Sequence, residues 1–126
     1  MTTVHATRPL YASITTRLVT TGKAVGQAVR PDGATPPYMV LYPREDLATE
    51  GGLGDPNEIR VVQFQVTSVG DTLEEADWMR HKAQVALLGF SPTGGGPILL
   101  EFAANVLRDD EGPVFSFPDR FITFVS

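Results

Sequence analysis

The stretch that decides the fold runs from Arg60 to Gly89 and reads RVVQFQVTSVGDTLEEADWMRHKAQVALLG. Its first part alternates in character: Val62, Phe64 and Val66 share one face of an extended chain, and Gln and Thr side chains share the other. A period of two is typical of a strand with one face buried. The sequence therefore predicts a half-buried strand over residues 60–70.

The second part of this stretch predicts a helix over residues 71–88. Asp71 stands three residues before Glu74, which is an Asp variant of the capping box, so each side chain can accept from the other's backbone N–H. Gly89 follows the last apolar pair and can take the left-handed conformation that ends a helix. The apolar stripe expected to pack on the sheet comprises Leu73, Ala76, Met79, Ala83, Ala86 and Leu87.

An amphipathic helix is also expected near the N-terminus, over about residues 9–21. Pro9 suits a first helical position, because its missing N–H has no intrahelical acceptor there. Leu10, Ile14 and Leu18 then recur at four-residue spacing, and Gly22 follows as a stop signal.

The remaining segments predict strands over 24–30, 38–42, 98–107 and 114–125, the last with a break at Pro118-Asp119. The order of elements is then α-β-β-β-α-β-β. This order is typical of an α+β domain, with a mostly antiparallel β-sheet flanked by two helices and closed by a long C-terminal β-hairpin. Residues 1–126 are expected to form a single domain.

Two segments predict loops. Residues 44–58 contain three glycines and charges of both signs, and we expect a flexible loop there that contacts a neighbouring molecule. Gly94-Gly95-Gly96 precedes a predicted strand, whereas a dinucleotide-binding loop precedes a helix, so this segment is expected to be a flexible link.

Composition disfavours several classes of function. The chain has 126 residues, a formal net charge of −5 and no cysteine, so disulfides and thiolate chemistry are excluded. No apolar stretch approaches the roughly 20 residues that a membrane span needs. An acidic chain with dispersed Lys and Arg also disfavours direct binding of nucleic acid, which relies on cations at phosphates.

No group of residues predicts catalysis, a cofactor or a metal. His5 and His81 lie far apart in the sequence and are expected on the surface. Glu74, Glu75 and Asp77 lie at the positive end of the helix dipole, which stabilises carboxylates. This explains their presence without a catalytic role. The Asp109-Asp110-Glu111 run lacks the alternating ligand spacing of a calcium loop and predicts a solvated turn. The sequence therefore predicts a protein that is not an enzyme.

Trp78 and several arginines are candidates for contacts between subunits. Trp78 is either at the edge of the core or at a subunit contact, because aromatic residues anchor interfaces. Arg30, Arg44, Arg60 and Arg108 lie near predicted strand ends, where arginine serves as surface charge or in intersubunit ion pairs rather than as a track for DNA. The candidate interface residues are Arg44, Leu53, Asp55, Arg60, Trp78 and Arg108.

Taken together, the segments resemble a known family. They are the N-terminal helix, AVGQAVRPDG at 24–33, PPYMVLY at 36–42, VVQFQVTS at 61–68 with its helix over 72–88, and RFITFV at 120–125. This pattern resembles the tail-terminator (tail-completion) proteins of long-tailed bacteriophages over nearly the whole chain.

The resemblance implies a structural protein of the virion that is assembled in the host cytoplasm. Its copies would form a ring, usually hexameric, that caps the head-proximal end of the tail tube and stops tube polymerisation. The implied partners are further copies of the chain, the major tail tube protein and a head-completion or stopper protein, while DNA passes through the channel without specific binding. Two alternatives stay open: a head-completion or stopper protein of the neck, and a small soluble binding module or enzyme with a pocket on the sheet.

Overall fold

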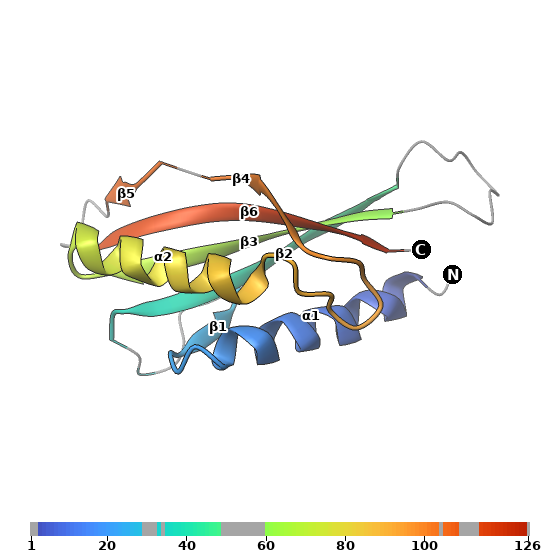
Figure 1. The fold of residues 1–126 in the computed structure, drawn as a ribbon, viewed down its shortest axis with the longest axis horizontal. Helices are drawn as coiled ribbons and strands as arrows, with labels where there is room; N and C mark the ends of the chain where they lie inside the picture. Colours follow the sequence, from blue (N-terminus) through green and yellow to red (C-terminus); the bar gives the residue numbers. More distant parts are fainter. Residues whose placement is uncertain are drawn as a thin grey trace.

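The computed structural model describes residues 3–28, 33, 35–48, 60–103, 105–108 and 114–125. Within these residues, two helices and six strands follow one another (Figure 1). Their bounds are α1 Thr3–Val19, β1 Val25–Gln27, β2 Tyr38–Ala48, β3 Arg60–Gly70, α2 Leu73–Leu87, β4 Leu99–Phe102, β5 Leu107–Arg108 and β6 Phe115–Val125. Neither helix is long and apolar enough to cross a membrane, as judged over the described residues.

The strands form one sheet in the order β1-β2-β3-β6-β4, and β5 also pairs with β6. β1 runs parallel to β2, and the other pairings are antiparallel. β3 lies at the centre and pairs along its whole length with β6, from Arg60 opposite Val125 to Gly70 opposite Phe115. The structure thus confirms the α+β class and the mostly antiparallel sheet.

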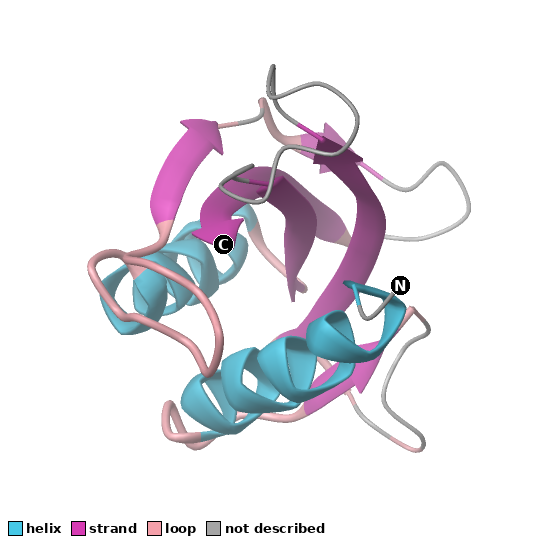
Figure 2. Cartoon of the chain, turned by 90° about the vertical axis from the view of Figure 1, so that its right-hand side faces the viewer, coloured by secondary structure: helices cyan, strands magenta, loops and turns pink. Residues whose placement is uncertain are grey.

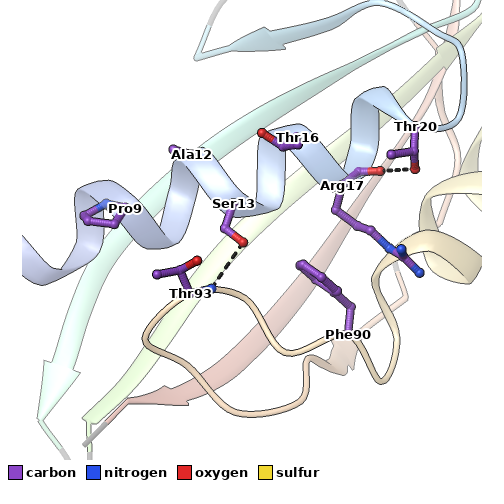
Figure 3. A pocket seen from close by; sticks show the side chains of 8 residues that line it. All are labelled: Pro9, Ala12, Ser13, Thr16, Arg17, Thr20, Phe90 and Thr93. Atoms are coloured by element: carbon purple, nitrogen blue, oxygen red, sulfur yellow. Dashed lines mark hydrogen bonds between the residues drawn. The ribbon is translucent and has the colours of Figure 1, made fainter.

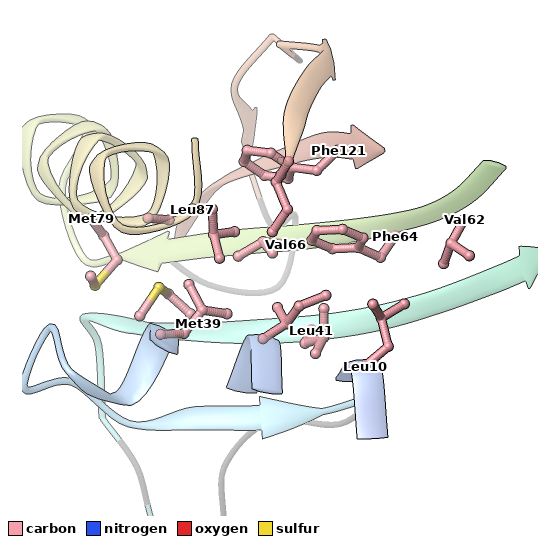
Figure 4. Close-up of a cluster of buried hydrophobic side chains, with 13 residues drawn as sticks. Leu10, Met39, Leu41, Val62, Phe64, Val66, Met79, Leu87 and Phe121 are labelled. Atoms are coloured by element: carbon pink, nitrogen blue, oxygen red, sulfur yellow. The ribbon is translucent and has the colours of Figure 1, made fainter. Parts of the chain in front are cut away.

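Both helices lie on the same side of the curved sheet (Figure 2). Between them and the sheet, the predicted apolar stripes meet in one core (Figure 4). Val62, Phe64 and Val66 are buried as their alternation predicts. The apolar residues that recur at four-residue spacing in α1 are buried with them. The fully buried side chains of this core include Leu10, Ile14, Leu18, Met39, Leu41, Met79, Leu87, Ile98 and Phe121.

An aromatic group organises the middle of the core. Phe64 and Phe121 are cross-strand partners, and their rings stack with centroids 5.6 Å apart and planes 16° from parallel. Tyr11 of α1 meets Phe64 edge-on, with centroids 6.3 Å apart. Such aromatic pairs contribute about 0.5–1.5 kcal/mol beyond their burial. They tie α1 to the two central strands.

The bounds of α1 differ from the predicted 9–21. The helix begins at Thr3, so Pro9 lies inside it and not at its first position. Proline has a φ compatible with a helix but cannot donate the backbone hydrogen bond of its turn. It can therefore stand at the start of a helix or inside one, and the sequence alone does not distinguish the two. At the other end the Thr20 and Thr21 hydroxyls donate to the carbonyls of Arg17 and Leu18, and Gly22 ends the turn with φ +84°.

The N-terminal cap of α2 lies one residue later than predicted. Thr72, not Asp71, is the N-cap, and its hydroxyl accepts from the Glu75 N–H at 3.0 Å. The Glu75 carboxylate accepts in turn from the Asp71 N–H at 2.8 Å, one residue before the cap, in an arrangement similar to a capping box. The helix therefore spans 73–87 rather than 71–88. Gly89 follows with φ +83°, as predicted.

The buried stripe of α2 also differs at one position. Ala76, Met79, Ala83, Ala86 and Leu87 are buried, but Leu73 is 48% exposed. Because each helical residue turns by about 100°, Leu73 lies at the margin of the stripe and not at its centre.

Close packing joins β3 to this helix. A Cβ on Gly70 would lie 2.3 Å from the Ala76 backbone nitrogen, so only glycine fits where the strand meets the first turn of α2.

Part of the predicted 44–58 loop is strand. β2 continues to Ala48, and its last residues pair with residues 60–62 of β3. The register shifts between Pro43 and Asp46, and such a bulge lets a strand continue past a residue that cannot donate to the ladder. Residues 49–59 lie outside the described residues, so their role as an interaction loop stays a prediction.

The predicted strand over 98–107 is two short strands, β4 and β5, which pair with different parts of β6. Conversely, β6 is continuous through Pro118, where a break was expected. Pro118 lies between the residues of β6 that pair with β5 and those that pair with β4. The missing N–H of proline is tolerated where the neighbouring ladder is interrupted.

The glycine run is part of the packed structure, so the expectation of a flexible link was wrong. The Gly96 N–H donates to the Phe124 carbonyl at 2.9 Å, and the Thr123 hydroxyl donates to the Gly96 carbonyl at 2.7 Å. A Cβ on Gly95 would lie 2.9 Å from the Thr123 hydroxyl oxygen and 3.0 Å from Leu10 Cδ1. Glycine is needed here because this segment crosses α1 and β6 closely.

Candidate interaction surface

The structure describes the six predicted interface residues only in part. Leu53 and Asp55 are outside the described residues, as are the side chains of Arg44, Arg60 and Arg108. The backbone nevertheless places Arg60 at the first position of β3, opposite Ala48 and Val125. Arg108 pairs with Phe115, which is itself opposite Gly70 at the other end of β3. Arg60 and Arg108 are therefore separated by about the length of β3, in which each residue extends the strand by about 3.3 Å.

Trp78 is the predicted residue whose surroundings are fully visible. It lies on the outward side of α2 and is 43% exposed, so it is not part of the core. The ammonium groups of Lys23 and Lys82 each lie 5.3 Å from the centre of its ring. Lys82 is one turn further along α2, whereas Lys23 belongs to the turn that follows α1. Together they form a cationic aromatic patch, and an exposed tryptophan is a common anchor of interfaces.

Three further apolar side chains lie exposed at the β4 edge of the sheet. All four residues of β4 are exposed, and Phe102 is exposed to 54%. Leu99 and Leu100 are consecutive, so they point to opposite sides of the strand and leave both sides apolar. An exposed apolar edge strand is a feature that soluble monomers usually avoid. The sequence does not reveal this edge, because a strand predicted over 98–107 does not show which strands lie beside it in the sheet.

An open groove of about 510 Å³ lies between α1 and the segment after α2 (Figure 3). It is lined by small or hydroxyl-bearing side chains together with Arg17 and Phe90. The Arg17 guanidinium lies 5.0 Å from the centre of the Phe90 ring, and its Nε donates to the Ala86 carbonyl at 2.8 Å. The Ser13 hydroxyl accepts from the Thr93 N–H at 3.2 Å. These contacts fasten the segment to α1, and the groove is a shallow surface for contact.

Beneath the outward surface, an ion pair between Arg80 and Asp119 joins α2 to the sheet. Arg80 Nε donates to the Asp119 carboxylate at 3.0 Å, and Gln84 donates to the same oxygen at 3.2 Å. Asp119 is 2% exposed, and the Arg80 guanidinium also lies 4.5 Å from the centre of the Phe117 ring. These groups therefore hold the helix in place. Among the described residues, no cluster of His, Asp or Glu has the arrangement of a metal site.

Comparison with known proteins identifies a shared fold. No protein-family model matches the chain, and no curated protein matches it by sequence. The fold is similar to that of a chain in the virion of a native gene transfer agent (GTA) particle, with a TM-score of 0.73 and 17% sequence identity. The similarity covers 95% of this chain and 96% of the other. This chain therefore shares its fold, over nearly its whole length, with a protein of that particle.

Proposed function

We propose that this protein is a structural subunit of a phage-like virion, and that its copies form a ring at the head-proximal end of the tail tube. The ring, hexameric as the resemblance to tail terminators implies, stops polymerisation of the tube and joins the tail to the head-completion proteins. Its partners are further copies of itself, the tube protein and a head-completion protein. DNA passes through the ring without specific contacts.

The likeness to a chain of the GTA virion carries this proposal. It extends over 95% of this chain and 96% of that one, so it involves the complete arrangement of helices and sheet rather than one common motif. The element order that resembles tail terminators points to the same class of protein, by an argument independent of the comparison.

The exposed apolar surface fits a subunit of an assembly. Leu99, Leu100 and Phe102 at the β4 edge and Trp78 on α2 are exposed in the isolated chain. Aromatic and apolar side chains are enriched in the parts of interfaces that become buried. A ring subunit needs contacts on more than one side, and the β4 edge is one surface available for such a contact.

Polymerisation of the tail tube tests the proposal. The tube protein encoded by the same genome would be allowed to polymerise with and without this protein, and tube lengths would be measured by negative-stain electron microscopy. We expect tubes that stop growing and carry a ring at one end when the protein is present. Unchanged tube lengths and bare ends, at a molar excess of folded protein, would exclude the tail-terminator function.

A further inference from the structure

The outward face of α2 has the spacing of a helix that packs against another helix. Its exposed residues include Glu74, Trp78, His81 and Val85, and the exposed Leu88 follows directly after the helix. These residues succeed one another at intervals of four, three, four and three. This is the spacing of the contact seam between paired helices. Three of the five are large apolar or aromatic residues, and Val85 is exposed to 66%.

This seam is distinct from the face that packs on the sheet. Ala76, Met79, Ala83 and Leu87 point into the core and are buried. The two stripes lie on opposite sides of the helix, because the turn of about 100° per residue separates their mean directions by roughly half a circle. The core therefore does not account for the apolar residues of the seam.

The exposed charges in and beside the seam change sign at Trp78. On its N-terminal side are the carboxylates of Glu74 and Asp77, and that of Asp71 just before the helix. Beyond Trp78, Lys82 brings an ammonium to the tryptophan ring, and Lys23 brings a second from the end of α1. Within the described part of the chain, neither lysine forms an ion pair with a carboxylate.

We propose that the seam binds the same seam of a second copy of this chain, with the two α2 helices antiparallel across a two-fold axis. Glu74 and Lys82 lie one turn to either side of Trp78, so an antiparallel partner brings each Glu74 beside the Lys82 of the other copy. Trp78 lies at the centre of the contact. A parallel arrangement would instead place like charges together, and antiparallel helix dipoles also attract.

The contact is separate from the ring. A two-fold interface uses the same surface on both copies, whereas a ring is closed by contacts between two different surfaces. The inference therefore does not rest on the proposed function. It predicts that the free protein is a dimer before it meets the tail.

Charge reversal tests the pairing. The full-length protein and the single variants Lys82→Glu and Glu74→Lys would be studied by analytical ultracentrifugation at concentrations up to about 100 μM. We expect a wild-type dimer, and a dissociation constant raised by about tenfold or more in each variant, because two like-charge contacts arise per dimer. An equimolar mixture of the two variants restores both opposite-charge contacts and should form a heterodimer.

Two controls make the result decisive. Thermal melting followed by circular dichroism would show that each variant is folded. Arg120→Glu has the same charge change as Lys82→Glu at an exposed position on the sheet and should leave the dimer intact.

The proposal would be overturned by a monomeric wild-type protein, by a dimer insensitive to both reversals, or by the absence of a heterodimer in the mixture. A ring-sized species that persists in both variants would also refute the α2 pairing, while the proposed tail function would stand.

Discussion

At the scale of single residues, the Arg80–Asp119 ion pair is a buried polar contact that joins α2 to the sheet. The carboxylate is almost fully buried, and the Arg80 guanidinium and the Gln84 amide are among the groups that offset the cost of burying it. A buried charge that loses its partner is far more costly than a surface pair.

Arg80→Met should therefore lower the free energy of unfolding by about 3–5 kcal/mol, measured by chemical denaturation. Arg120→Met, which removes an exposed arginine next to Asp119 in the sequence, should change it by less than about 0.5 kcal/mol. Similar losses in both variants would show that the buried ion pair does not stabilise the fold.

At the scale of elements, the two leucines of α2 that the sequence assigns to one stripe have different environments. Leu87 is fully buried in the core, whereas Leu73 is about half exposed. Leu87→Ala should cost about 2–5 kcal/mol of unfolding free energy, because it leaves a cavity among packed side chains. Leu73→Ala should cost much less. Equal costs in urea denaturation would contradict the observed orientation of the helix.

Elements with a regular period could be predicted from the sequence, since burial follows directly from spacing. Val62, Phe64 and Val66 in β3 and Leu10 in α1 are buried as expected. Boundaries were less predictable. Asp71 and Thr72 are both good N-caps, and only the path of the chain from Gly70 decides between them. The split of β4 from β5 depends on pairing with β6, which is remote in sequence.

The interaction surface was predictable only in part. The exposed tryptophan could be singled out because aromatics are common at interfaces, and Lys82 lies one turn away on the same helix. Lys23 could not be connected with it, since only the packing of α1 beside α2 brings it to the ring. The exposed β4 edge required knowledge of the strand order.

At the scale of the whole molecule, the net charge determines whether a ring would attract or repel DNA. Each subunit carries a formal charge of −5, so six copies sum to about −30. We expect the isolated protein to bind random duplex DNA weakly or not at all in a fluorescence-polarisation titration at low salt, because it repels phosphates. Micromolar, salt-sensitive binding would instead favour a neck protein that grips the end of the genome.

The central claim is that this protein ends the tail tube and joins it to the head. Electron microscopy of particles from a producer strain that lacks only this gene tests it most directly, with the gene supplied in trans as the control. We expect overlong tubes that are not attached to heads in the deletion strain, and normal tails in the complemented strain. Complete particles with tails of normal length in the deletion strain would contradict it.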